Sequence, residues 1–314
     1  MALPSFPLNN GESIPAIGAG CWISTPGGVD DAREMVENAL KIGYRHIDTA
    51  FAYQNEESVG QAIRNSGIPR DQIYLVTKLY DIHHGSVQEG LEISLKQLGV
   101  DYVDLYLMHW PQARDPNTGK VLQPNEHPNF VETWKAMEQL LDTGKVKSIG
   151  VSNFSRKNLE VLLPQAKVIP AVNQIELHPL LPQLDLLEFC REQKIVVTAY
   201  SPLGQGHPDL ITHAVLKDIA LRLGGVTTAQ VIMGWFVKKG IVAIPKSSNP
   251  ARLRENITYA DISADDEAQV DAIHRVPGMH RTLLMKYHEP GGKLFGWTYE
   301  QLGWPAFKED GVVP

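Results

Sequence analysis

The sequence predicts an α/β protein of the (β/α)8 TIM-barrel type. Short β-rich runs alternate with amphipathic helical stretches along the chain, and eight such pairs can be counted. The segment Gly18-Ala19-Gly20, at the first strand, lacks the third glycine of a dinucleotide-binding turn, which argues against a doubly wound sheet. Right-handed crossovers between parallel strands would close the eight pairs into a barrel. Because no composition break divides the 314 residues, we expect one domain over 1–314.

The first elements are a hairpin and one strand–helix pair. An Asn-Asn-Gly turn signal separates two short apolar runs, so residues 6–17 are predicted to form a hairpin ahead of the barrel. A strand is expected over 19–23. The following helix starts at about Val29, carries apolar side chains at helical spacing and stops at Gly43.

The same strand–helix pair then recurs to the end of the barrel. The further strands are expected over 45–50, 73–79, 103–109, 148–152, 171–176, 195–200 and 241–245. The helices are expected over 59–65 and 87–98, after an N-cap at Asn129, and from near Arg156, Pro182, Pro208 and Pro250. Residues 277–314 add no further pair. Their aromatic and glycine residues predict a long C-terminal tail folded over one mouth of the barrel.

Composition excludes several classes of function. Lys and Arg number 29 against 36 Asp and Glu, a net charge of −7, so no basic surplus is present for nucleic acid or anionic lipid. The N-terminus has no secretory signal pattern, and no 18-residue apolar run predicts a membrane span. Cys21 and Cys190 supply neither a disulfide framework nor a metal quartet, and we interpret both as buried apolar side chains. We expect a cytoplasmic protein without nucleic-acid or membrane partners.

Polar residues end nearly every predicted strand, where TIM barrels carry their chemistry. Asp48, Tyr53, Lys78 and His109 come from three successive strand ends. An ammonium group favours the phenolate of a neighbouring tyrosine and lowers its pKa from about 10, and a carboxylate keeps the buried ammonium charged. We therefore expect Asp48 and Lys78 to tune Tyr53 as a proton donor. His109 can donate to a substrate oxygen or relay a proton.

Five motifs closely resemble those of the aldo-keto reductases. They are IDTAFAYQNEESVG, TKL, DLYLMHW, GVSNF and IPKSSNPARLREN, in family order along nearly the whole chain. The resemblance implies NADPH-dependent reduction of small aldehydes and ketones without a metal. Hydride passes from the nicotinamide to the carbonyl carbon, Tyr53 protonates the oxygen and His109 orients the substrate. The tail sequence GWTYEQLGWPAF is similar to that of fungal members that also oxidise glycerol-type polyols.

The resemblance also implies where the cofactor lies. Ser152, Asn153 and Gln174 would hold the nicotinamide carboxamide, and Tyr200 would stack on the ring. The remaining contacts that it implies are Cys21, Trp22, Ser201, Leu203, Lys246, Ser247, Ser248, Asn249, Arg252, Glu255 and Asn256.

Cofactor preference has a physical argument of its own. Lys246 and Arg252 supply two cations beside the start of the last helix, which is an anion-binding end. The 2′-phosphate of NADP needs such cations, so NADP is favoured over NAD, with NADH as a weaker cofactor.

Four aromatic residues are candidates for the substrate pocket wall: Trp22, Trp110, Phe295 and Trp297. Trp110 directly follows the proposed catalytic histidine, and the last two lie in the tail. Most members of the resembled family are monomers or weak dimers. We expect a monomer, with a weak dimer as the alternative.

Two other readings of the sequence stay open. A metal-dependent barrel hydrolase would use histidines such as His46 together with Asp48, but it would leave Lys78 and Tyr53 without roles. A non-catalytic NADPH-binding regulatory subunit could use the same fold. The intact set of four polar strand-end residues disfavours that second reading.

Overall fold

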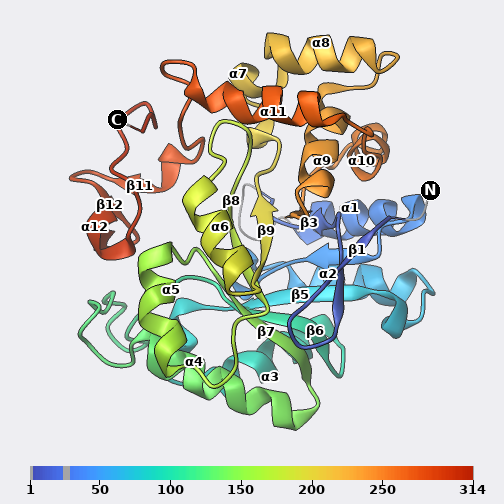
Figure 1. Cartoon of the computed structure of the whole chain (residues 1–314). Helices are drawn as coiled ribbons and strands as arrows, with labels where there is room; N and C mark the ends of the chain where they lie inside the picture. The colour runs from blue at the N-terminus through green and yellow to red at the C-terminus, as the bar shows by residue number, and fades with distance from the viewer. Residues whose placement is uncertain (1–2, 24–28, 314) are drawn as a thin grey trace.

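A computed structural model describes residues 3–23 and 29–313, and its centre is an eight-stranded parallel sheet with helices packed around it (Figure 1). Each strand pairs in parallel with the next one along the chain, in the order β3 to β10. The strands are β3 (Ala19–Gly20), β4 (His46–Asp48), β5 (Tyr74–Leu79), β6 (Val103–Met108), β7 (Val146–Ser152), β8 (Val172–Glu176), β9 (Val196–Tyr200) and β10 (Val242–Ala243).

Backbone hydrogen bonds join the first strand to the last and close the sheet into a barrel. Gly18 N donates to Ala243 O at 2.9 Å, Ala243 N donates to Ala16 O at 2.9 Å, and Gly20 N donates to Pro245 O at 3.2 Å. The predicted (β/α)8 barrel is therefore confirmed. The last strand is shorter than the predicted 241–245 because Pro245 has no N–H to continue the ladder.

The N-terminal hairpin fills the amino end of the barrel. It pairs β1 (Ser5–Pro7) with β2 (Ser13–Pro15), as predicted over 6–17. Its Leu8 and Ile14 are buried against inward-facing side chains of the barrel, including Val76 and Leu107. Asn10 Nδ2 also donates to Ser148 Oγ at 2.9 Å. With this end filled, only the carboxyl end of the barrel is free to hold a site.

The helices follow the predicted order, with one earlier start, one shorter helix and four additional helices. They are α1 (Val29–Ile42), α2 (Glu56–Asn65), α3 (Val87–Leu98), α4 (Phe130–Gln139), α5 (Arg156–Leu162), α6 (Leu184–Glu192), α7 (Pro208–Ile211), α8 (Ala214–Arg222), α9 (Thr228–Lys238), α10 (Pro250–Ile257), α11 (Ala264–Ala272) and α12 (Tyr299–Leu302). The predicted cap Asn129 begins α4, with a reciprocal bond from Glu132. Helix α2 starts at Glu56, three residues before the predicted start at 59. Its first turn has no apolar residue that would mark it as helix, although the polar side chain of Glu56 is buried. The helix predicted near Pro208 is only a short one, and α8, α9, α11 and α12 are additional to the predicted helices.

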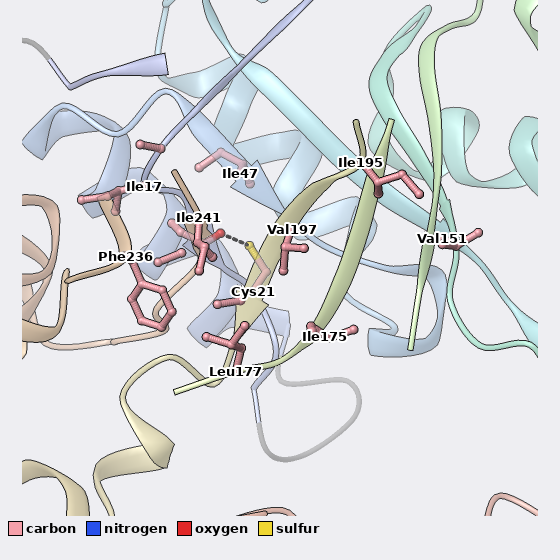
Figure 2. Packing of buried hydrophobic residues seen from close by; sticks show 14 of the residues in the cluster. Ile17, Cys21, Ile47, Val151, Ile175, Leu177, Ile195, Val197, Phe236 and Ile241 are labelled. Atoms are coloured by element: carbon pink, nitrogen blue, oxygen red, sulfur yellow. Dashed lines mark hydrogen bonds between the residues drawn. The ribbon is translucent and has the colours of Figure 1, made fainter. Parts of the chain in front are cut away.

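Most of the apolar core lies between the barrel and its helices. Figure 2 shows one part of it, where Phe236 of α9 lies beside Ile241 and on the same side as Val197 of β9. Cys21 lies in the same cluster and is fully buried, and its thiol is directed to Ala19 O. None of the described helices is both long and apolar enough to cross a membrane.

The C-terminal tail lies against the carboxyl mouth of the barrel. It contains a small antiparallel sheet of β11 (His288–Glu289), β12 (Lys293–Leu294) and β13 (Trp297–Thr298), shown with α12 at the opposite side of Figure 1 from β1. Gln112 Nε2, in the loop after β6, donates to Leu294 O at 2.9 Å. Trp22 Nε1, after β3, donates to Tyr287 Oη at 3.0 Å. The tail thus forms part of the wall at this mouth.

Close packing of α2 on α3 depends on Gly60. A Cβ at this position would lie 1.9 Å from Leu98 O, a backbone atom that cannot move aside. We expect Gly60→Ala to lower the free energy of unfolding by about 3 kcal/mol despite the better helix propensity of alanine. Urea denaturation measures the change. The control is Gln61→Ala on the exposed face of α2, which should change stability by no more than about 0.5 kcal/mol. Equal stability of the two variants would contradict the packing argument.

Candidate active site

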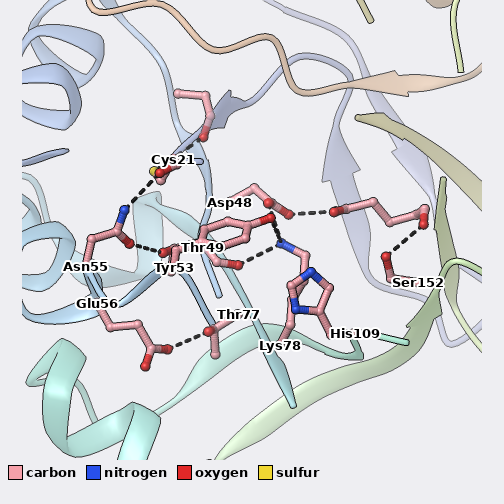
Figure 3. A network of polar contacts seen from close by, with 12 residues as sticks. Cys21, Asp48, Thr49, Tyr53, Asn55, Glu56, Thr77, Lys78, His109 and Ser152 are labelled. Carbon is pink, nitrogen blue, oxygen red and sulfur yellow. Dashed lines mark hydrogen bonds and ion pairs between the residues drawn. The ribbon is translucent and has the colours of Figure 1, made fainter. Parts of the chain in front are cut away.

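A buried ion pair lies at the centre of the site. Lys78 Nζ, near the end of β5, lies 2.6 Å from Asp48 Oδ1, at the end of the neighbouring β4 (Figure 3). Their side chains are 0% and 1% exposed. The ammonium also donates to Thr49 O at 2.7 Å, and Gln174 Nε2 donates to Asp48 Oδ2 at 2.7 Å. Both charges are therefore paired and hydrogen-bonded, which an ion pair without water requires.

Tyr53 and His109 complete the predicted set of four. Tyr53 ends the short turn η1 (Phe51–Tyr53) after β4, and its hydroxyl lies 3.5 Å from Lys78 Nζ. Its ring centre lies 5.7 Å from the imidazole of His109, edge to face, and 5.1 Å from the indole of Trp22. The structure brings the four residues together in one place, as their positions at successive strand ends predict.

The predicted lowering of the Tyr53 pKa is wrong in direction. Burial raises the pKa of Tyr53 well above its usual range, and the carboxylate of Asp48 adds to the increase. The Lys78 charge is already paired with that carboxylate at 2.6 Å, so it does not offset the loss of solvent. Burial, followed by the charge of Lys78, lowers the pKa of His109 well below its usual range. At neutral pH the site therefore presents a protonated phenol beside a neutral imidazole.

A row of polar side chains continues from this centre across β7, β8 and β9. Ser152 Oγ donates to Gln174 O at 2.8 Å, and Tyr200 Oη donates to Asn153 Oδ1 at 2.8 Å. Asn153 Nδ2 donates to His109 O at 2.9 Å, which ties the row to the loop after β6. Asn153 Nδ2 also donates to Ser152 Oγ at 3.1 Å, so these four predicted residues form one hydrogen-bonded group.

A cavity of about 880 Å³ opens above these side chains. Most of the predicted site residues line it. They are Cys21, Trp22, Asp48, Tyr53, His109, Trp110, Ser152, Asn153, Gln174, Tyr200, Ser201, Leu203, Lys246, Ser247, Ser248, Arg252, Glu255, Asn256 and Phe295. Lys78 lies beneath the cavity and acts on it only through Tyr53 and Asp48. The volume is typical of a site for a small organic ligand.

One end of the cavity is cationic. Lys246, just after β10, and Arg252, in the first turn of α10, both line it and are exposed. Within 3–23 and 29–313, neither cation has a carboxylate partner. Asn249 does not line the cavity as expected, because its side chain caps α10 by accepting from Ala251 N at 2.8 Å. The helix N-terminus and these two cations make this end suited to an anion.

Of the four aromatic residues predicted at the substrate pocket, Trp22, Trp110 and Phe295 line the cavity. The rings of Trp110 and Phe295 meet edge to face at 4.9 Å on the cavity wall. Trp297 does not line the cavity. Its side chain is turned into the core, and its Nε1 donates to Leu122 O at 2.7 Å. Its neighbour Gly296 has a positive φ of 83°, part of the bend that directs the two aromatic residues to different places.

Sequence reasoning missed several residues of the cavity wall. Tyr287 from the tail and Glu176 at the end of β8 both line it. Glu176 lies two residues after Gln174 in β8. Side chains two apart on a strand point to the same face, so the position of Gln174 could have indicated that Glu176 lines the cavity. Tyr287 lies in a segment without regular periodicity, so no local signal pointed to it.

The described residues also contain no group of three or more histidine, cysteine or acidic side chains placed to share a metal.

A comparison with protein families agrees with this geometry. The model of the "Aldo/keto reductase family" matches residues 16–276, which cover the barrel. The chain belongs to the aldo/keto reductase family.

Relatives within the aldo/keto reductase family match along most of the chain. The "Glycerol 2-dehydrogenase (NADP(+))" of Saccharomyces cerevisiae is 44% identical over 292 residues, which cover 88% of this chain and 92% of that protein. An aldehyde reductase of the same yeast is 43% identical and covers 89% and 94%. The crystal structure of an aldo-keto reductase of the silkworm, Bombyx mori, has a TM-score of 0.80 at 36% identity, covering 87% of this chain and 88% of that one. A further aldo-keto reductase structure, solved with NADPH, has a TM-score of 0.79 at 34% identity and the same coverage.

A second buried acid lies behind the reductase site. Thr77 Oγ1, next to Lys78 in β5, donates to Glu56 Oε1 at 2.5 Å (Figure 3). Burial raises the pKa of Glu56 to about 7, against the opposing effects of its hydrogen bonds and of Lys78. The folded chain therefore retains a proton that the unfolded chain releases as the pH rises from 4.5 to about 7. The contribution of Glu56 therefore lowers the free energy of unfolding progressively as the pH rises over that range.

Replacing this carboxyl group by a neutral amide should remove the pH dependence. We expect the free energy of unfolding of Glu56→Gln, relative to that of wild type, to increase by about 2 to 3 kcal/mol as the pH rises from 5 to 8. Urea denaturation of both proteins at the two pH values measures the gain. Glu57→Gln, on the exposed face of the same helix, is the matched control and should show no such difference. If the free energies of unfolding of wild type and Glu56→Gln differ by the same amount at both pH values, Glu56 is ionised in the folded protein throughout this range.

Proposed function

We propose that this chain reduces aldehydes and ketones to alcohols with NADPH, and that Tyr53 is the proton donor. The observation that carries this proposal is the arrangement of one cavity with a protonated phenol at its inner end and, at its outer end, two cations that have no carboxylate partner among the described residues. The reaction is reversible in principle, so oxidation of polyols such as glycerol uses the same groups.

The side chains of the site suit reduction of a carbonyl group. Tyr53 retains its proton at neutral pH and can donate it to the carbonyl oxygen as negative charge develops there. The Lys78 ammonium lies 3.5 Å from the phenol oxygen and can donate a hydrogen bond to the phenolate that remains after the proton has been transferred. Asp48 keeps Lys78 charged and in position. His109 is neutral and can donate one N–H to the same carbonyl oxygen, which fixes its orientation.

The residues of the cavity also fit the cofactor. NADPH supplies the hydride when it is bound. Lys246 and Arg252, with the N-terminus of α10, would hold the 2′-phosphate, and the row from Ser152 to Tyr200 would hold the nicotinamide. Glu255 and Asn256 line the same end and suit the adenine.

The relatives support the same proposal. One is named for NADP-dependent glycerol oxidation, one for aldehyde reduction, and one structural relative was solved with NADPH. We further propose that the 314 residues act as one catalytic domain, as a monomer in the cytoplasm. Both cysteines are free thiols, which suits a reducing compartment.

Removal of the Tyr53 hydroxyl tests the proposed proton donor. We expect Tyr53→Phe to lower kcat for an aldehyde by at least about 100-fold, because general acid catalysis contributes on that scale. The Kd for NADPH, measured by protein fluorescence, should stay within about twofold, since the ring remains. Tyr102→Phe, where Arg70 and Lys147 pack on the ring rather than the hydroxyl, is the control and should keep wild-type kcat. Full activity of the Tyr53 variant would refute the assigned role.

The cationic end of the cavity predicts cofactor preference. We expect Lys246→Ala and Arg252→Ala to weaken NADPH binding about tenfold each, because each loses a charge-assisted contact to the 2′-phosphate. NADH, which lacks that phosphate, should bind almost unchanged. Arg254→Ala on the same helix is the control, since that side chain is exposed and directed back to Pro250 O. Equal losses for NADPH and NADH would place the 2′-phosphate elsewhere.

A further inference from the structure

Tyr287 of the tail lies beside the proposed proton donor. Its hydroxyl accepts a hydrogen bond from Trp22 Nε1 at 3.0 Å, and the ring of Trp22 lies 5.1 Å from that of Tyr53. Burial raises the pKa of Tyr53 and of Tyr200, and Tyr287 adds to the increase at both. Tyr287 is thus close to both phenols and is separated from Tyr53 by one indole ring.

The Tyr287 hydroxyl has an unused proton. A phenol can donate one hydrogen bond as well as accept, and here the accepted bond comes from Trp22. Throughout the described part of the chain, no acceptor lies within hydrogen-bond distance of this donor. Tyr287 also lines the cavity. The hydroxyl proton is therefore available to a ligand in the cavity.

Glu176 holds the segment that carries Tyr287. This carboxylate is buried at the end of β8 and accepts from Thr282 Oγ1 at 2.5 Å and from Leu283 N at 2.9 Å. Thr282 Oγ1 in turn accepts from Leu284 N at 3.2 Å. Directly after Leu284, a 3-10 turn places Tyr287 over Trp22. The hydroxyl is thus fixed to the barrel on both sides, by Glu176 and by Trp22.

We propose that Tyr287 is a specificity-determining residue that donates a hydrogen bond to an oxygen on the carbon next to the substrate carbonyl. The proposal rests on the proposed carbonyl reduction. Tyr287 and Tyr53 line the same cavity and both contact Trp22, so a small substrate that reaches Tyr53 with its carbonyl oxygen can present a second, neighbouring oxygen to Tyr287. The substrate class is α-oxygenated carbonyl compounds, such as α-hydroxy ketones, α-hydroxy aldehydes and α-keto esters. Thr282 and Glu176 act as positioning residues.

Two ketones of nearly equal shape test the proposal. Hydroxyacetone and butan-2-one differ only in a hydroxyl group or a methyl group next to the carbonyl. We expect wild type to favour hydroxyacetone in kcat/KM, and Tyr287→Phe to lower kcat/KM for hydroxyacetone about tenfold, mostly through KM. For butan-2-one the change should stay within about twofold. Tyr102→Phe should leave the ratio between the two ketones at the wild-type value.

The positioning role has its own variants. Thr282→Val removes the hydroxyl that links Glu176 to Leu284, and should lower the same ratio without changing the Kd for NADPH. Thr282→Ser retains that hydroxyl and should restore the ratio. Equal losses for both ketones in Tyr287→Phe, or an unchanged ratio, would overturn the proposal.

Equilibrium binding separates this proposal from the proposed function. Calorimetric titration of hydroxyacetone and butan-2-one into the protein with saturating NADP needs no turnover. A preference for hydroxyacetone that disappears in Tyr287→Phe supports the proposal even if wild type reduces neither ketone, a result that would overturn only the proposed reaction. No preference in wild type would overturn the role of Tyr287 even if both ketones are reduced.

Discussion

The buried pair of Lys78 and Asp48 is the constraint on which the rest of the site depends. Two charges without solvent must satisfy each other and their remaining hydrogen bonds, and removal of one partner of such a pair typically costs about 3 to 5 kcal/mol. Here the pair draws together β4, β5 and β8, because Thr49 O and Gln174 Nε2 supply the other bonds. The same pair sets the field around Tyr53. Stability at this end of the barrel and the chemistry of the phenol therefore have one origin.

Different physical effects prepare the two ends of the cavity for a ligand. At the inner end, burial fixes the protonation of Tyr53 and His109, and the charges that act on them are already paired. At the outer end, Lys246 and Arg252 are exposed and unpaired among the described residues, so their charge is available to a ligand. A ligand that contacts both ends must carry an anionic group at one end and reach the buried polar centre at the other. A dinucleotide phosphate together with a small carbonyl compound meets both requirements.

Much of the barrel and its centre could be predicted from the sequence because the signals are local. Periodic apolar residues mark the strands and helices, and polar residues at strand ends converge once the strands are parallel, as Asp48, Lys78 and His109 do. The pKa of Tyr53 could not be predicted in the same way, since burial depends on distant segments that enclose the ring. Trp297 and Tyr287 show the same limit. Both lie in the tail, where single bends decide which side chain enters the core and which lines the cavity.

The seam of the barrel, where β3 meets β10, links ligand binding to the stability of the folded protein. Both strands are two residues long, so few backbone hydrogen bonds hold the seam closed. Trp22 follows one of them and Lys246 the other, and both line the cavity. A ligand that contacts both bridges the seam, and its binding free energy adds to the free energy of unfolding. The concentration of that ligand then governs how often the barrel opens, and so how long each molecule of the protein survives proteolysis.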